Sequence, residues 1–312
     1  MPRSPALGYT FVTLAALLWS TLGIFGRLLY ARGATALTVA TSRPLLAALI
    51  LLVAIGATRP RLLRVRPRDL GFFAGYGLIS VAVFYYTWFY AVEKTGVTTA
   101  VLLLYTAPAY VAVFSAIFFR EPMTRVKWLA LALAIGGSVL VSGAYDPAAL
   151  RLNGPGVAAA LIAGLTYALY SVFGRLAGVR FSPWTTLFYT FAFGAVFLFA
   201  VWLPTSPGQA AVIFRAWPLV LAAAIFPTIA SYSLYLFGLS MVETSKASIT
   251  ANLEPVAAVF LARVILGERV AGPELAGAAL VLGGVLAIQV TDLLAVDRGR
   301  SKRGTGEEGV SP

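Results

Sequence analysis

Long apolar segments recur along this chain and are separated by short polar stretches. They lie approximately at residues 9–29, 36–57, 70–91, 97–119, 128–144, 155–174, 183–203, 217–240, 247–266 and 273–291. A helix needs roughly 20 apolar residues to cross the hydrocarbon core of a bilayer, whereas a transmembrane strand is shorter and alternates apolar with polar positions. The pattern therefore predicts an all-helical integral membrane protein with ten transmembrane helices.

Two of the apolar segments carry the same motif at the same spacing. Pro108 is followed by Glu121 as Pro255 is followed by Glu268, and the two motifs are 147 residues apart (255−108 and 268−121). Two further matches occur at offsets of 147 and 148 residues: the glycine pairs Gly136-Gly137 and Gly283-Gly284, and the tetrapeptides Phe25-Gly-Arg-Leu28 and Phe173-Gly-Arg-Leu176. We interpret the chain as a tandem duplication.

The duplication and the helix count together predict an inverted repeat. The first repeat spans residues 9–144 and the second spans 155–291, with five helices in each, and a polar tail at 292–312 is expected to be disordered. Because five is an odd number, the second repeat enters the membrane from the opposite face. Inverted repeats are characteristic of secondary transporters, whose substrate sites lie near the bilayer midplane where the two halves meet.

Composition supports a membrane protein. The chain is 60% hydrophobic and 12% charged, with a net charge of +12, against roughly 45–50% and 25% in a soluble domain. The positive charge does not indicate nucleic-acid binding, because the basic residues lie in short loops between spans. Those assigned to one face include Arg59, Arg61, Arg64, Arg66, Arg68, Arg120, Arg125, Lys127, Arg175, Arg180 and Lys246. Positive charge accumulates on the cytoplasmic side, so both termini are predicted to be cytoplasmic.

The missing residue types make an enzyme improbable. The chain has no cysteine and no histidine, so it lacks a thiol nucleophile, the commonest general base and the usual metal ligands. It also lacks the G-x-x-x-x-G-K-[ST] loop that binds the phosphates of ATP. We expect no catalytic residue, no cofactor and no metal site. An intramembrane enzyme is the rival hypothesis, but it needs a nucleophile and a base.

A polar stripe distinguishes the ninth span from the fourth. Lys246, Thr250 and Glu254 share one helical face, and Ser245, Ser248 and Asn252 share the adjacent one. A carboxylate facing lipid at the helix centre costs roughly 2.5–3.5 kcal/mol, so this face is expected to point into the bundle or a wet cavity. Ser248, Asn252 and Glu254 are candidate substrate-binding residues, and Glu254 is alternatively a structural hydrogen-bond partner of another helix.

Aromatic residues supply the other expected wall of the cavity. Trp19, Tyr76, Tyr105, Tyr167 and Tyr232 lie well inside their spans, where a tyrosine hydroxyl needs a partner or water. The run 88–90 lies near the end of its span and is expected to anchor the interface. Two other features lie inside the spans. Arg43 carries a charge whose partner the sequence does not identify, and Pro108 and Pro255 act as packing kinks or as gating hinges.

These motifs resemble the drug/metabolite transporter superfamily, in its ten-span branch of paired EamA domains. The resemblance covers residues 9–290, and its marks are Leu253-Glu254-Pro255-Val256, Leu266-Gly267-Glu268-Arg269, Ala107-Pro108, Arg120-Glu121-Pro122 and the glycine pairs. It implies a secondary transporter with a small-molecule substrate, and the aromatic-rich sequence looks most like the YddG-type amino-acid exporters. The first repeat departs from the acidic-proline pair because it has Ala107 where the second has Glu254.

The sequence therefore predicts a monomeric transporter in the inner membrane of a bacterium. The expected function is export of amino acids, including aromatic ones, or related metabolites by alternating access. A drug or nucleotide-sugar transporter of the same superfamily is the alternative. Proton coupling and uniport both stay open at this point, and Glu254 is the carboxylate best placed within a span to carry a proton.

Overall fold

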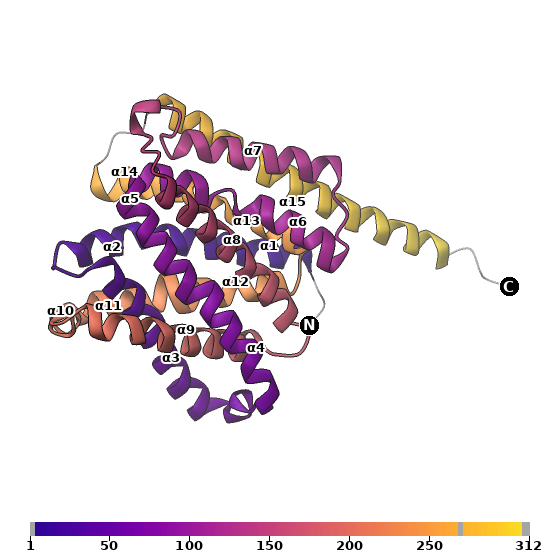
Figure 1. Ribbon diagram of the computed structural model, residues 1–312. Coiled ribbons are helices and arrows are strands. Elements are labelled where there is room, and N and C mark those ends of the chain that lie inside the picture. Colours follow the sequence, from indigo (N-terminus) through magenta and orange to yellow (C-terminus); the bar gives the residue numbers. More distant parts are fainter. Residues whose placement is uncertain (1–3, 268–270, 308–312) are drawn as a thin grey trace.

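The computed structural model describes residues 4–267 and 271–307, and the regular elements in that part of the chain are all helical (Figure 1). The first half contains α1 (Pro5–Ser20), α2 (Leu22–Tyr30), α3 (Ala36–Thr58), η1 (Pro60–Leu63), α4 (Pro67–Gly77), η2 (Leu78–Val83), α5 (Phe84–Leu104), α6 (Ala107–Phe119), α7 (Arg125–Val141) and η3 (Pro147–Ala149). The second half contains α8 (Gly154–Ala177), α9 (Pro183–Thr205), α10 (Gln209–Arg215), α11 (Trp217–Ala224), η4 (Ile225–Ala230), α12 (Ser231–Leu239), α13 (Thr244–Ala251), α14 (Leu253–Leu266) and α15 (Gly272–Glu307).

The apolar segments are helical, as the sequence predicts. In the described part of the chain, eight apolar stretches of 22–38 residues are long enough to cross a membrane, and the shorter apolar helix α6 adds a further segment. The longest stretch, Pro67–Leu104, is interrupted at Gly96, whose φ of 78° is favourable for glycine. This confirms an all-helical integral membrane protein. Glu268, which belongs to the repeated motif, lies outside the described residues.

Two helices contain a π-helical turn at equivalent distances along the chain. The segment η2 connects α4 to α5, and η4 connects α11 to α12. Pro227 lies in η4 and has no N–H to donate, and the Thr228 hydroxyl donates to the Ala223 carbonyl five residues earlier at 2.8 Å. Such π turns are rare and often occur at functional sites. The residues that follow both turns contribute aromatic side chains to the centre of the bundle.

Two further helices are broken inside the bundle. The chain leaves the helical path at Tyr105 and Thr106, between α5 and α6, and again at Asn252, between α13 and α14. Pro108 and Pro255 come at the start of the second half-helix in each case, where a missing N–H costs little. The structure thus places both prolines at helix interruptions. Their role as hinges stays a prediction.

The helices α7 and α15 lie side by side along one edge of the bundle (Figure 1). Their backbones approach closely because two glycines face each other. A Cβ atom at Gly137 would lie 2.6 Å from the Gly277 carbonyl oxygen, and a Cβ atom at Gly277 would lie 2.5 Å from the Gly137 carbonyl oxygen. Small residues permit such contacts between transmembrane helices.

Gly137→Ala is expected to lower the stability of the protein by about 1–3 kcal/mol, because the new methyl group meets backbone that cannot move without separating α7 from α15. Gly136→Ala is the matched control, since nothing lies within 4 Å of a Cβ atom there. Thermal unfolding of both variants in detergent, followed by tryptophan fluorescence, measures the difference. Equal midpoints for the two variants would contradict the packing described for Gly137.

The last helix extends past the end of the predicted second repeat. α15 continues to Glu307 (Figure 1), and the disorder expected of the tail stays a prediction. Asp292 accepts hydrogen bonds from the Tyr9 hydroxyl at 2.9 Å and from Lys246 Nζ at 2.5 Å. These contacts fix this turn of α15 against α1 and α13, which the polar character of the sequence after 291 does not reveal.

Candidate functional site

A cavity of about 1080 Å³ opens at one end of the bundle and extends to its centre. Exposed side chains mark its mouth, namely Arg27 and Tyr30 at the end of α2 and Glu93 and Val97 in α5. The cavity is lined by Trp19, Ser20, Leu22, Gly23, Gly26, Arg27, Tyr30, Thr35, Ala36, Leu37, Val39, Arg43, Phe84, Tyr85, Tyr86, Trp88, Phe89, Tyr90, Val92, Glu93, Val97, Val101, Leu104, Tyr105, Val141, Ser142, Tyr167, Tyr232, Glu254, Pro255, Ala258 and Val259.

Aromatic rings close the inner end of the cavity. The Trp19 ring meets the Tyr232 ring edge-on at 5.0 Å, and the Phe84 ring lies 5.4 Å from the Tyr167 ring and 5.0 Å from the Tyr85 ring. These separations are typical of favourable aromatic pairs. The rings form a largely apolar wall, from which a few polar atoms point into the cavity. Such a surface suits a ligand that combines an apolar part with a small number of polar groups.

Five of the eight predicted binding residues lie on this cavity. Trp19, Tyr105, Tyr167, Tyr232 and Glu254 all contribute to its lining, although they come from five different helical segments or breaks. Of the two predicted hinges, Pro255 also lines the cavity. The helical periodicity and depth of these residues in their spans had singled them out. Whether they bind substrate stays a prediction.

The other three predicted binding residues lie elsewhere. Tyr76 is fully buried and its hydroxyl donates to the Tyr170 carbonyl at 2.8 Å, which satisfies it without a cavity. Ser248 and Asn252 are buried in and next to α13 and are not part of the lining. Pro108, the first predicted hinge, is likewise buried away from the cavity. Burial of a polar residue thus did not distinguish the cavity from contacts between helices.

Sequence reasoning missed the outer aromatic wall. Trp88, Phe89 and Tyr90 line the cavity, where interfacial anchors were expected from their position near the end of a span. The signal was present in the density of rings between 84 and 90. Their role as interfacial anchors stays a prediction, because lining the cavity does not test it.

Two charged side chains of opposite sign lie in the inner part of the cavity. Arg43 on α3 donates to the Tyr85 hydroxyl and lies over the Tyr85 ring at 5.1 Å. Glu254 lies in the first turn of α14, just after the break at Asn252. Among the described residues, neither charge forms an ion pair. Charged groups in a membrane interior usually mark a transport pathway.

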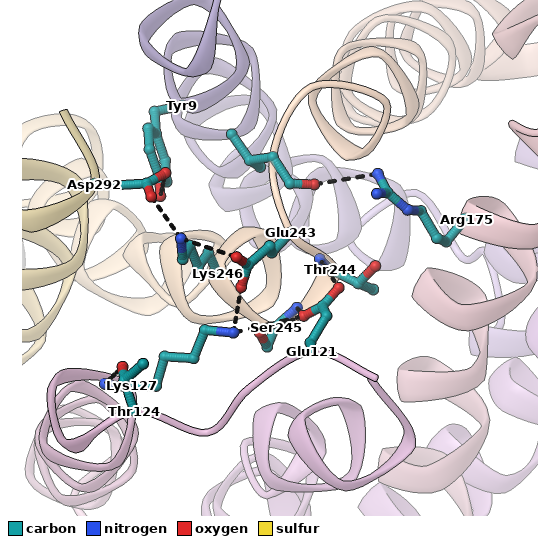
Figure 2. A network of polar contacts seen from close by, with 11 residues as sticks. Tyr9, Glu121, Thr124, Lys127, Arg175, Glu243, Thr244, Ser245, Lys246 and Asp292 are labelled. Atoms are coloured by element: carbon teal, nitrogen blue, oxygen red, sulfur yellow. Dashed lines mark hydrogen bonds and ion pairs between the residues drawn. The ribbon is translucent and has the colours of Figure 1, made fainter. Parts of the chain in front are cut away.

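The opposite end of the bundle is closed by a cluster of charged residues, which we call the closing cluster (Figure 2). It consists of Glu121, Lys127, Glu243, Lys246 and Asp292. Lys127 contacts Glu243 and lies 3.8 Å from Glu121, while Lys246 lies 3.2 Å from Glu243 and 2.5 Å from Asp292. The cluster joins the start of α7, the start of α13 and α15 into one connected layer.

Glu121 also caps the start of α13. Its carboxylate accepts hydrogen bonds from the Thr244 N–H at 2.7 Å, the Ser245 N–H at 3.0 Å and the Ser245 hydroxyl at 2.5 Å. A carboxylate at a helix N-terminus satisfies backbone donors that have no partner inside the helix and interacts favourably with the helix dipole. These contacts tie the segment after α6 to the start of α13.

Lys246 does not line the cavity, although its position on the polar helical face predicted that it would. It belongs to the stripe that includes Glu254, but its ammonium group points into the closing cluster and not into the cavity (Figure 2). The break at Asn252 separates the two residues into different half-helices, α13 and α14. The predicted continuous stripe is therefore divided between two ends of the molecule.

Apolar helices surround a cavity that opens at one end of the bundle, and charged residues join the helices at the other, an arrangement typical of a multi-pass membrane transporter. The model of the EamA-like transporter family matches the chain twice, at residues 6–143 and 154–290, and the chain belongs to this family. Members of the family are transporters and not enzymes, which confirms that prediction.

Individual relatives agree with this assignment. An uncharacterized transporter of Archaeoglobus fulgidus is 29% identical over 213 residues, which cover 67% of this chain and 74% of the relative. The threonine/homoserine exporter RhtA of Escherichia coli K12 is 30% identical over 224 residues, covering 71% of this chain and 70% of the relative. A solved crystal structure matches with a TM-score of 0.77 at 20% identity and covers 92% of this chain and 98% of its own, and at that identity it shows the fold alone.

Proposed function

We propose that this protein exports amino acids or closely related small metabolites from the cytoplasm by alternating access. The observation that carries the proposal is the difference between the two ends of the molecule. A central cavity opens at one end, and the closing cluster joins helices across the other end. A transporter needs two such states, each open on one side. The open cavity end and the closed opposite end support the interpretation of this structure as one of the two states.

The proposal includes ten transmembrane helices in two inverted five-helix repeats, at residues 9–144 and 155–291. Several features recur at the offset of 147 residues and support it. The π turns η2 and η4 begin at residues 78 and 225, and the helix breaks fall at 105 and 252. Tyr85 and Tyr232, also 147 residues apart, both line the cavity. An inverted repeat makes the outward-open and inward-open states two related packings of one chain.

The distribution of charge supports a direction for the cavity. The basic loops that the positive-inside rule places in the cytoplasm lie at the end with the closing cluster, and the start of α1 and the end of α15 lie toward the same side of the bundle (Figure 1). On this assignment the termini are cytoplasmic, and the cavity is open to the exterior of a bacterial inner membrane. A monomer suffices, because one chain supplies the whole lining.

The closing cluster recurs only in part at the offset of 147 residues: Glu121 and Lys127 correspond to Glu268 and Glu274, so the first lysine has an acidic counterpart. Positions 147 residues before Glu243, Lys246 and Asp292 hold Gly96, Thr99 and Tyr145. None of these side chains carries a charge, so closure at the other end cannot form the same ion pairs. The proposed transporter is therefore biased toward the state that is open to the exterior, which suits release of an exported substrate.

The substrate class follows from the cavity and from the relatives. A volume of about 1080 Å³ admits a small metabolite with room for water, and its aromatic wall favours an apolar side chain. Opposite charges at Arg43 and Glu254 suit a zwitterion. RhtA, at 30% identity, is named for export of two amino acids, threonine and homoserine. Aromatic amino acids are included in the proposal because of the rings that line the cavity.

Counterflow into proteoliposomes tests the proposal. Purified protein is expected to exchange labelled L-threonine or L-phenylalanine, and Trp19→Ala is expected to slow the exchange by about tenfold or more, since it removes a ring from the inner wall. Phe260→Ala is the control, because this side chain is exposed on α14 and lies outside the cavity. Exchange of cationic drugs or nucleotide sugars, with none of amino acids, would overturn the proposed substrate class.

A further inference from the structure

Arg43 is a buried cation without a counter-ion. Only 3% of the residue is exposed, yet it lines the cavity. Its guanidinium donates to the Tyr85 hydroxyl, a neutral acceptor, while its Nε atom has no hydrogen-bond partner. Within residues 4–267 and 271–294, no carboxylate lies within ion-pair distance of it. A buried charge is stable only when it is paired or solvated, so Arg43 has unused capacity for an anion.

A second donor at the same wall also lacks an acceptor. Trp19 is 4% exposed and lines the cavity, and its indole Nε1 atom has no hydrogen-bond partner in the described structure. Both donors belong to the aromatic inner wall: the Trp19 ring lies 5.0 Å from the Tyr232 ring, and the Arg43 guanidinium lies over the Tyr85 ring at 5.1 Å. The inner wall thus presents two hydrogen-bond donors, one of them charged.

A carboxylate is the ligand group that fits these donors. It supplies a negative charge for the guanidinium and enough lone pairs to accept from both side chains. The planar guanidinium presents its N–H groups in a fork that matches carboxylate geometry, and the contact with Tyr85 fixes the orientation of that fork. A neutral amide or hydroxyl group satisfies the hydrogen bonds but leaves the charge uncompensated.

We propose that Arg43 and Trp19 bind the carboxylate of the transported substrate, with Tyr85 as the residue that positions Arg43. This inference rests on the proposed export of amino acids and specifies which part of the substrate the site recognises. The side chain of the substrate then meets the rings of Phe84 and Tyr167. Selection occurs at the free carboxylate, and the aromatic wall tolerates different side chains.

The test compares ligands that differ only in this group. L-phenylalanine and L-phenylalaninamide both keep the ammonium group, so contacts made by Glu254 are the same for both. Isothermal titration calorimetry of the purified protein is expected to show about tenfold or greater preference for phenylalanine. Arg43→Gln is expected to reduce this preference to near one while binding of the amide is kept, and Arg43→Lys to retain part of it. Arg263→Gln is the matched control, because this arginine lies exposed on α14 away from the cavity.

A preference for phenylalanine that survives in Arg43→Gln overturns the carboxylate site, and amino-acid exchange in proteoliposomes would still support the proposed function. Conversely, 3-phenylpropionate binding that depends on Arg43, without any amino-acid exchange, supports the site and overturns the function. If Arg43→Gln does not fold, Tyr85→Phe takes its place. It keeps the charge and removes the acceptor that orients it, so the preference is expected to fall several-fold, and an unchanged preference contradicts the proposal.

Discussion

Lys127→Met is expected to release the closed end of the bundle. Lys127 is buried against Glu121 and Glu243, with 2% of its side chain exposed, and methionine leaves both carboxylates without this partner. Removing one member of a buried ion pair typically costs about 3–5 kcal/mol, which corresponds to a rise of roughly a hundredfold or more in local opening. Hydrogen exchange of the Thr244 and Ser245 amides measures this effect, because both donate to Glu121.

The matched control is Lys94→Met. Lys94 pairs with Glu93 at 2.8 Å, but both side chains are well exposed, so solvent already screens the pair. We expect no measurable change in the exchange of the Thr244 and Ser245 amides. If Lys127→Met also leaves those amides protected, the closing cluster does not hold this end shut, and helix packing must do so instead.

Glu254→Gln is expected to abolish accumulation of substrate driven by a pH gradient while downhill exchange is kept, because the glutamine carbonyl oxygen still accepts a hydrogen bond from an ammonium group. Uphill export needs a coupled gradient, and carboxylates within membrane spans are the usual proton carriers. Glu254 lines the inner cavity and has no ion-pair partner among the described residues, so a proton from the open side can reach it. Proteoliposomes with a pH gradient that is acidic on the side receiving labelled substrate measure accumulation.

Glu274→Gln serves as the control, since Glu274 accepts from the Ala271 N–H at the start of α15 and lies outside the cavity. Accumulation by Glu254→Gln with the pH dependence of the wild type would make Glu254 structural. Loss of all binding would mean that the substrate requires the charge of Glu254 and not only a hydrogen-bond acceptor. A wild-type protein that ignores the pH gradient is a uniporter.

Much of the fold could be predicted because a bilayer imposes a simple rule on sequence. Long apolar segments must be helical, and their spacing and repetition were visible without coordinates. The end of the last span was not visible in this way. Asp292 looks like the start of a polar tail, but its contacts with Tyr9 and Lys246 come from residues far away in sequence. Local hydropathy carries no information about such partners.

The candidate site was predictable only in part, for a related reason. A polar side chain inside a span indicates that lipid is absent, but it does not say whether water or protein takes its place. Glu254 meets the cavity, whereas Lys246, eight residues earlier, meets the closing cluster. The helix break at Asn252 directs them to different ends. Arg43 shows the same limit, because only the structure identifies Tyr85 as its partner.

Cysteine accessibility from the two sides of the membrane tests alternating access most directly. The chain has no cysteine, so Val101→Cys and Ser248→Cys are clean single reporters at positions 147 residues apart, one on the cavity and one buried at the closed end. In the resting protein, Val101→Cys is expected to react with an impermeant thiol reagent from outside intact cells, and Ser248→Cys to resist it in inside-out vesicles. Adding Lys127→Met is expected to reverse both results. Simultaneous reaction of both positions in one state, or no change with Lys127→Met, would contradict a cavity that opens alternately to the two sides.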